Sequence, residues 1–297
     1  MSRLAKIVTG LAATAVIGWA VLWKAAQTNP KHPYQQPPDG NATETKSTYQ
    51  QPPDGNASGS DNNKTVTPVI YVPTHFCDGE VSEYKITIKK GIFAAPVGRC
   101  SFSAKRVDTN GTVGWRFRLE GGALAGIIRY DATSMVNAAF NHTRKYHTVQ
   151  KDLASRNVEL EFDEPNRVCR RTLNGQPGGE VATREHTLDP LSIIFKFREM
   201  NLDEPGEFSS AVSDGKATFD AKVTVVGREE IKIGDQTYKA ILVEPDLGPM
   251  RGIFRKEEGA KLQIWLSDDA HQTALRIKTE IKHGTFTADL ENYTRPN

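Results

Sequence analysis

The sequence lacks a surplus of charge of either sign. Its 297 residues hold 38 Lys and Arg against 36 Asp and Glu, which gives a net charge of +2. Arg3, Lys6 and Lys24 lie in the first 28 residues, where there is no acidic residue, so the rest of the chain carries −1. Nucleic-acid binding requires clustered cations that neutralise phosphates. We therefore predict no nucleic-acid partner.

Motifs for catalysis or cofactor binding are also lacking. Gly121-Gly122 and Gly178-Gly179 are without the glycine-rich loop and following helix that bind phosphates. His142 and His147 are five residues apart, which places them on different faces of a helix or a strand, and cations lie between them. We therefore predict no cofactor, no metal site and no catalytic residue, and we favour a non-enzymatic role.

Cysteine is scarce, with Cys77, Cys100 and Cys169 as the three in the chain. In an oxidising compartment two of them can pair, and a Cys77–Cys100 bridge would tie the leading segment of the domain to its first hairpin. Cys169 lies among cations in Arg167-Val168-Cys169-Arg170-Arg171, and such neighbours can activate a thiol. We favour a small core residue for Cys169 over a catalytic thiol.

Long apolar runs are absent except near the N-terminus, where residues 7–23 (IVTGLAATAVIGWAVLW) include no charge. Their number is just sufficient for a helix that spans the hydrocarbon of a bilayer. Arg3 and Lys6 lie in residues 1–6, and basic residues stay preferentially in the cytoplasm. We predict a single-pass membrane anchor at 7–23, with the rest of the chain on the periplasmic, extracytoplasmic side. The alternative is a cleaved signal peptide.

Residues 24–68 are predicted to form a disordered tether. Pro, Gly, Asn, Gln, Ser and Thr dominate, and too few apolar side chains are present to offset the entropy of the chain. The sequence YQQPPDGNA occurs twice, at residues 34–42 and 49–57. Two copies are too few for a solenoid, so we favour a flexible spacer over a Pro-rich docking motif. The extracytoplasmic domain is predicted to occupy residues 69–297.

Within this domain apolar and polar residues alternate, which is typical of strands with one buried face. In residues 113–119 every second side chain from Val113 is apolar, and Arg116 and Arg118 lie between them. The turn Gly234-Asp235 joins two such segments and predicts a β-hairpin. Similar alternation covers residues 84–88, 100–104, 158–162, 219–225, 238–242 and 275–281.

One helix is predicted over Asp189–Arg198. Asp189 suits the N-cap and Pro190 suits the first helical position. A second helix is predicted between Ala132 and Phe140. The fold class is therefore mostly β, with about ten strands and one or two helices. This composition indicates a strongly curved antiparallel sheet or an incomplete barrel wrapped around a helix.

Short segments between Gly79 and Leu290 share the pattern of a known family. They start at Gly79-Glu80 with Tyr84, are most specific at Asp189-Pro190-Leu191-Ser192 followed by Arg198, and continue through residues 223–231 and 264–269 to Gly284. On these residues the sequence resembles a bacterial envelope family named domain of unknown function 3108 (DUF3108). The resemblance implies a periplasmic β-rich domain. Its half-barrel is loosely similar to lipoprotein-carrier folds, which hold acyl chains, although fold analogy alone gives no function.

The anchor, the tether and the aromatic strands together suggest a functional hypothesis. We predict a non-enzymatic envelope protein whose curved sheet binds an apolar or amphipathic ligand, such as a lipid or lipoprotein chain, or docks an envelope partner. Trp115, Phe117, Phe195 and Trp265 would line its cavity. The alternative is a scaffolding domain in which these four are core residues; a thiol- or carboxylate-dependent enzyme is less favoured. An open cavity supports binding and a filled interior supports scaffolding.

Overall fold

The computed structural model describes residues 71–109, 111–152, 155–203, 206–248, 261–281 and 284–296. The predicted anchor at 7–23 and the predicted tether at 24–68 lie outside these ranges. Within the described ranges, no helix combines the length and the apolar character needed to cross a membrane.

These ranges form a single sheet of 14 strands, and every neighbouring pair in it is antiparallel. The strands are β1 (Glu80–Lys90), β2 (Phe93–Thr109), β3 (Thr112–Ala123), β4 (Ile128–Asn137), β5 (Thr143–Lys151), β6 (Ser155–Asp163), β7 (Val168–Leu173), β8 (Gln176–Ala182), β9 (Glu207–Ser213), β10 (Thr218–Ile233), β11 (Gln236–Asp246), β12 (Leu262–Ser267), β13 (Ala274–Ile281) and β14 (Gly284–Thr294). A short 3-10 turn, η1 (Leu124–Gly126), joins β3 to β4. The predicted mostly β class and curved antiparallel sheet are confirmed.

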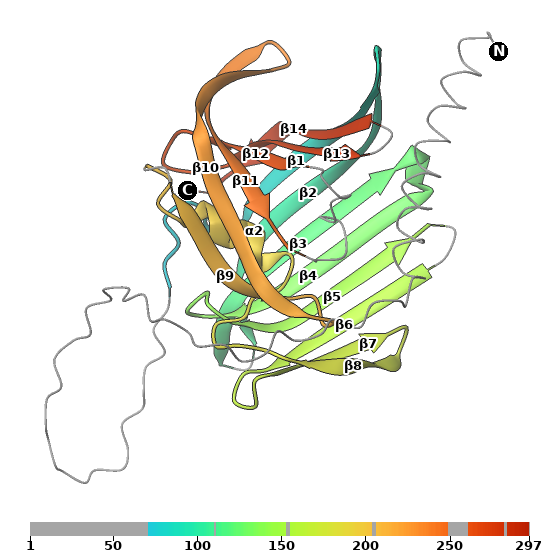
Figure 1. Cartoon of the computed structure of the whole chain (residues 1–297), viewed down its shortest axis with the longest axis vertical. Helices are drawn as coiled ribbons and strands as arrows, with labels where there is room; N and C mark the ends of the chain where they lie inside the picture. The colour runs from blue at the N-terminus through green and yellow to red at the C-terminus, as the bar shows by residue number, and fades with distance from the viewer. Residues whose placement is uncertain are drawn as a thin grey trace, which may run out of the picture.

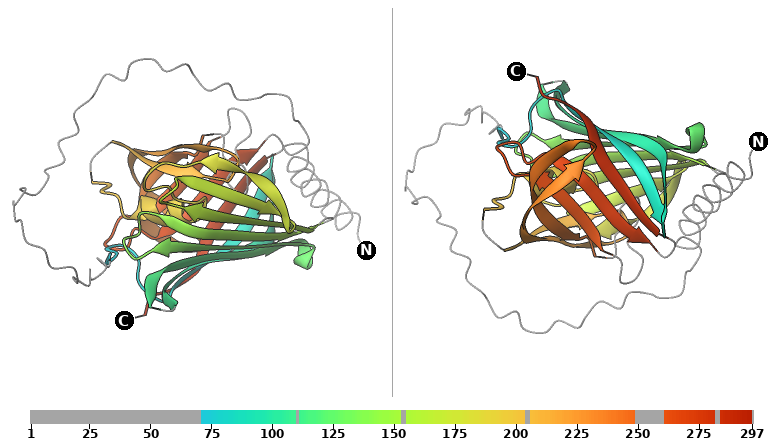
Figure 2. Two further views of the ribbon diagram at one scale, coloured as in Figure 1. Left: turned by 90° about the horizontal axis from the view of Figure 1, so that it is seen from below. Right: turned by 90° about the horizontal axis from the view of Figure 1, so that it is seen from above.

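The order of strands explains why the barrel is incomplete. The sheet runs β8-β7-β6-β5-β4-β3-β2-β1-β14-β13-β12-β11-β10-β9, so the first and last strands pair in the middle and β8 and β9 form the edges. Among the described residues these two edges do not pair with each other, and the curved sheet stays open (Figures 1 and 2). The segment between the edges contains the helix α2 (Ser192–Arg198), around which the sheet curls.

Strand β3 shows how alternation in the sequence sets the two faces of the sheet. Trp115, Phe117 and Leu119 are buried at 4%, 0% and 5% exposure, whereas Arg116 and Arg118 between them are exposed. Successive side chains of a strand point to opposite faces. We call the face that holds Phe117 the inner face and the opposite one the outer face.

The helix predicted between Ala132 and Phe140 is wrong, because these residues belong mainly to β4. Ala132, Ser134 and Val136 are buried at alternate positions, which is the period of a strand. β4 also pairs along its length with β3 and β5. Hydrogen bonds and side-chain packing on both sides outweigh the local preference of the segment.

The helix predicted over Asp189–Arg198 is present but begins later, at Ser192. A turn through Pro190 and Leu191 precedes it, and the Ile193 amide donates to the Asp189 carbonyl at 3.2 Å. The helix is almost completely buried on the inner side of the sheet, with Lys196 as its one partly exposed residue.

The carboxylate of Asp189 fixes the start of α2. It accepts the backbone N–H groups of Leu191 and Ser192 at 2.8 and 3.1 Å, which is the role of a helix cap. It also accepts hydrogen bonds from the hydroxyls of Ser134, Thr143 and Ser192. Asp189 is 0% exposed, so these donors replace water around the buried carboxylate. The start of α2 is thereby joined to β4 and β5.

Arg198 fixes the other end of α2 through a buried ion pair with Glu80 of β1. The side chains are 6% and 2% exposed. The Tyr293 hydroxyl of β14 donates to the same Glu80 carboxylate at 3.2 Å. The Arg198 guanidinium also donates to three backbone carbonyls at 2.8–3.0 Å, those of His75, His271 and Gln272.

We predict that Arg198→Met lowers the free energy of unfolding by about 3–5 kcal/mol, because the buried Glu80 carboxylate loses its closest counter-charge and keeps only Arg295 at 3.9 Å. Urea denaturation monitored by tryptophan fluorescence measures this loss. Arg276→Met is the matched control, since its ion pair with Asp289 is partly exposed and is expected to contribute about 1 kcal/mol or less. Equal losses in the two variants would contradict the importance given to the buried pair.

Candidate functional site

Three of the four predicted ligand-contacting aromatic residues form one packed cluster on the inner face. The rings of Phe117 and Phe195 stack with centroids 4.2 Å apart, and Trp115 lies 6.4 Å from Phe117. Phe76 contacts all three rings edge-on at 5.1–5.6 Å. Such edge-to-face and offset contacts are typical of a hydrophobic core.

Trp265 lies elsewhere, in a second cluster with Ile231, Ala240 and Leu275. Its indole N–H donates to Glu229 Oε1 at 2.6 Å. The structure therefore brings Trp115, Phe117 and Phe195 together but not Trp265. Beside Phe195 is a cavity of about 20 Å³, which has room for about one water molecule. Ligand contact by these four side chains stays a prediction.

The predicted Cys77–Cys100 disulfide does not form, and all three cysteines are free thiols. The Gly79 amide donates to the Ala104 carbonyl at 2.9 Å, so the segment that holds Cys77 lies beside the region of β2 after Cys100. Cys100 is four residues before Ala104, a distance of about 13 Å along a strand. A disulfide needs Cα atoms within about 7 Å.

Burial makes the thiols of Cys100 and Cys169 poor nucleophiles. Desolvation raises the pKa of each to about 12. Cys169 is 0% exposed and belongs to the main hydrophobic core. At neutral pH almost none of it is the reactive thiolate, which supports its interpretation as a small core residue.

His142 and His147 lie on different sides of the sheet. His142 is 3% exposed and packs edge-on to Phe162 with centroids 6.2 Å apart. His147 lies on the outer face, with Nε2 2.8 Å from Asn157 Oδ1. Across the described ranges, no group of three His, Cys, Asp or Glu residues is arranged to hold a metal ion.

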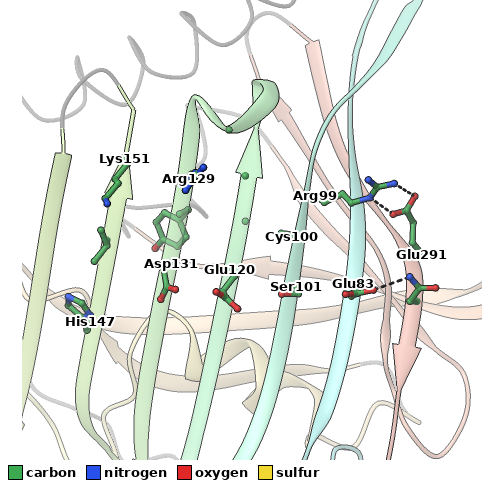
Figure 3. Close-up of a pocket in the computed structure, with 16 residues that line it drawn as sticks. Glu83, Arg99, Cys100, Ser101, Glu120, Arg129, Asp131, His147, Lys151 and Glu291 are labelled. Atoms are coloured by element: carbon green, nitrogen blue, oxygen red, sulfur yellow. Dashed lines mark hydrogen bonds and ion pairs between the residues drawn. The ribbon is translucent and has the colours of Figure 1, made fainter.

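A hollow of about 850 Å³ lies on the outer face, across β14, β1, β2, β3, β4 and β5 (Figure 3). We call it the outer hollow. Its lining includes six charged side chains that alternate along their strands with inner-face residues: Glu83, Arg99, Glu120, Arg129, Asp131 and Lys151.

The cations of the outer hollow lie in one row, which we call the basic row. Strand register aligns Arg99, Gly122, Arg129 and Lys151 across β2 to β5. Neighbouring strands are about 4.8 Å apart, so Gly122 separates the two arginines by about 10 Å. A Cβ at Gly122 would meet a single backbone oxygen at 3.4 Å. The space between the two arginines is therefore open.

Two members of the basic row are available to a ligand. Arg99 pairs with Glu291 at 2.8 Å, and this hydrogen bond lowers the pKa of the Glu291 carboxyl. Arg129 and Lys151 are exposed and have no ion-pair partner within the ranges that the structure describes. An anion in the hollow would therefore meet them without breaking an existing ion pair.

An acidic row of Glu83, Glu120 and Asp131 lies two residues along each strand, about 7 Å from the basic row. Arg118 Nη2 contacts Glu120 at 2.7 Å and Asp131 at 2.6 Å. The Asn292 amide donates to Glu83 at 2.9 Å. The outer hollow thus presents the basic row beside the acidic row, and Arg118 partly neutralises the charge of the acidic row.

Sequence reasoning missed the outer hollow. Alternation shows that Arg99, Arg129 and Lys151 face away from the core, but their alignment depends on the register of four strands. A charged outer face is also common to many solvated sheets. The available signal was Gly121-Gly122, because glycine inside a strand often marks the close approach of a ligand or another backbone.

Residues 83–291 match a family model described as a protein of unknown function, DUF3108. The match covers well over half of the 297 residues. The chain belongs to the DUF3108 family. The resemblance from Gly79 to Leu290 is thereby confirmed, and no curated protein matches the sequence.

Two solved structures are similar to this DUF3108 chain. One is a β-barrel-like protein of domain of unknown function DUF1849 from Brucella abortus, with a TM-score of 0.50, 7% identity, and coverage of 75% of this chain and 100% of that chain. The other is a "putative lipoprotein from Parabacteroides distasonis", with a TM-score of 0.28, 10% identity, and coverage of 75% and 99%. The first likeness concerns the fold alone, and the second is too weak to support an argument.

The buried imidazole of His142 should make the stability of the DUF3108 domain depend on pH. Burial lowers the pKa of its imidazole from 6.5; Glu164 at 3.7 Å opposes this shift, whereas His186 and Arg144 reinforce it. The unfolded chain therefore binds a proton at a higher pH than the folded chain does. Stability is complete above about pH 6.5 and falls as the pH drops toward the folded pKa.

We expect His142→Phe to flatten the loss of stability between pH 7 and pH 5, because phenylalanine keeps the ring beside Phe162 and cannot be protonated. Urea unfolding at several pH values measures the slope. The control is His147→Asn, which changes a partly exposed imidazole on the outer face and should leave the slope close to that of the parent. An unchanged slope in His142→Phe would count against this assignment.

Proposed function

We propose that the DUF3108 domain is a non-enzymatic binding domain of the cell envelope, and that its outer hollow holds an amphipathic ligand with an anionic head group. The observation that carries the proposal is the basic row. Arg129 and Lys151 face a hollow of about 850 Å³ without ion-pair partners among the described residues. Gly122 leaves space between Arg99 and Arg129 for an anionic group. Guanidinium groups bind phosphate and carboxylate oxygens in pairs.

The lining of the outer hollow suits the two parts of such a ligand. Gly121, Gly122 and Val149 contribute backbone and aliphatic surface between the charged side chains. The uncharged part of an amphiphile can lie there while its head group meets the basic row. A cationic or hydroxyl group of the ligand would meet Glu83, Glu120 or Asp131 about 7 Å away.

The packing of the inner face favours ligand binding in the outer hollow over ligand binding in an internal cavity. The rings of Trp115, Phe117 and Phe195 pack against one another and against Phe76. An acyl chain would have to displace these contacts, whereas the outer hollow is already open. The envelope location rests on the predicted anchor at residues 7–23, which would place the domain on the periplasmic side.

A scaffolding domain is the second candidate, favoured by the packed aromatic cluster. An enzyme has less support, because Cys169 is buried and Arg118 holds both Glu120 and Asp131. Two carboxylates tied to the same guanidinium are poorly placed for proton transfer to a substrate.

We predict that Arg129→Gln/Lys151→Gln weakens binding of an anionic amphiphile at least tenfold. A hydrogen bond to a charged group contributes about 1.5–3 kcal/mol, and about 1.4 kcal/mol is tenfold in affinity. The probe is dihexanoyl phosphatidic acid below its micelle concentration, titrated by calorimetry into the full-length chain in nanodiscs of neutral lipid. Gly122→Leu, which fills the space between the arginines, is expected to have a similar effect.

The matched control is Lys232→Gln/Lys239→Gln, which removes the same charge from exposed positions of β10 and β11. The affinity of this variant for dihexanoyl phosphatidic acid should stay within about twofold of that of the parent chain. Inorganic phosphate is titrated in parallel, and equal binding of phosphate would show that the amphipathic part is not recognised. If the parent chain binds neither probe, the scaffolding candidate is favoured.

A further inference from the structure

The turn between β1 and β2 exposes two large apolar side chains side by side. Ile92 is 92% exposed and Phe93 is 58% exposed. Gly91 enters the turn with a φ of +57°, a conformation that favours glycine. These two side chains have no role in the core, and apolar side chains exposed next to each other are a feature of surfaces that contact a partner or a membrane. We call residues 89–94 the hairpin tip.

The hairpin tip projects beyond the neighbouring strand. β2 pairs with β3 only from Gly98 onward, whereas residues 93–96 pair with β1 alone. The stretch from Phe93 to Gly98 corresponds to about 16 Å of strand. Figure 1 shows this hairpin extending past the other strands of its half of the sheet.

The free edge of the projecting hairpin is unsuited to pairing with a strand from another protein. Pro96 lies within it and has no N–H to donate. Proline on an edge strand is a known means of blocking such pairing. A bulge at Ile86/Thr87 also breaks the regular register of the hairpin.

The charge around the hairpin tip has one sign. Residues 85–98 contain three cations and no acidic residue, the cations being Lys85, Lys89 and Lys90. Lys89 and Lys90 are both exposed immediately before Gly91. The surface of an anionic bilayer is uniformly negative and attracts such clusters, whereas a protein partner would have to present a matching acidic patch.

We propose that the hairpin tip docks onto the surface of an anionic lipid bilayer. Ile92 and Phe93 enter the interfacial region, where exposed apolar side chains are stabilised, and Lys89 and Lys90 contact lipid phosphates. Docking of the hairpin tip does not depend on the ligand proposed for the outer hollow. The predicted anchor at residues 7–23 would hold the tip near the same bilayer, so that a weak contact is enough to orient the domain.

Photo-crosslinking of the full-length chain in its native membrane tests this contact. Phe93→p-benzoylphenylalanine places a reactive ketone at the hairpin tip, and Ile92→p-benzoylphenylalanine provides an independent second position. Mass spectrometry of the irradiated chain then separates lipid adducts, adducts with another protein and dimers of this chain. We expect phospholipid adducts to dominate at both positions.

The matched control is Val226→p-benzoylphenylalanine, which replaces another exposed apolar residue of the same sheet (53% exposed). We expect its lipid adduct to be at least tenfold less abundant. Lys89→Gln/Lys90→Gln should lower the Phe93 lipid adduct at least fivefold. Each lysine near an anionic surface contributes about 1 kcal/mol, which is about fivefold in binding. Protein adducts, dimers, or equal lipid labelling at Val226 would overturn the proposal, whatever the outer hollow binds.

Discussion

Two buried charged groups hold helix α2 inside the curved sheet, and the rest of the architecture depends on them. Asp189 joins the start of the helix to Ser134 and Thr143, while Arg198 joins its end to Glu80. Neither group can leave its partners without exposing a buried charge or polar group to an apolar environment, which costs several kcal/mol. The helix therefore fixes β4 and β5 relative to β1 and β14, and through them the curvature of the open barrel.

The attachment of α2 through Asp189 and Arg198 determines which face of the sheet is available for binding. Because α2 and the aromatic rings fill the inner face, Phe195 stacks on Phe117 and leaves little free volume there. The same packing fixes the strand register, since a shift by one residue would turn every inner side chain outward. The alignment of Arg99, Gly122 and Arg129 on the outer face thus follows from the packing behind it.

The sequence predicts those features that depend on local pattern. Alternation in residues 113–119 identifies β3 and its buried face, and Asp189-Pro190 identifies the approach to α2. The local pattern of Ala132–Phe140 wrongly predicts a helix, because the pairing of this segment with two strands is a long-range property. The Cys77–Cys100 prediction fails for the same reason, since register and not spacing sets their separation. The basic row is a third long-range feature, formed from strands that the sequence does not place side by side.

The positions of the outer hollow and the hairpin tip on shared strands constrain how both could work. Arg99 lies six residues after Phe93 on β2, a distance of about 20 Å along a strand. If the tip touches the bilayer surface, the hollow stands in the aqueous layer outside the head groups. Its ligand would then have to leave the bilayer or arrive from water, which suits the exposed charges of the basic and acidic rows. A fully apolar ligand would gain little in that position, because the hollow offers it no enclosed cavity.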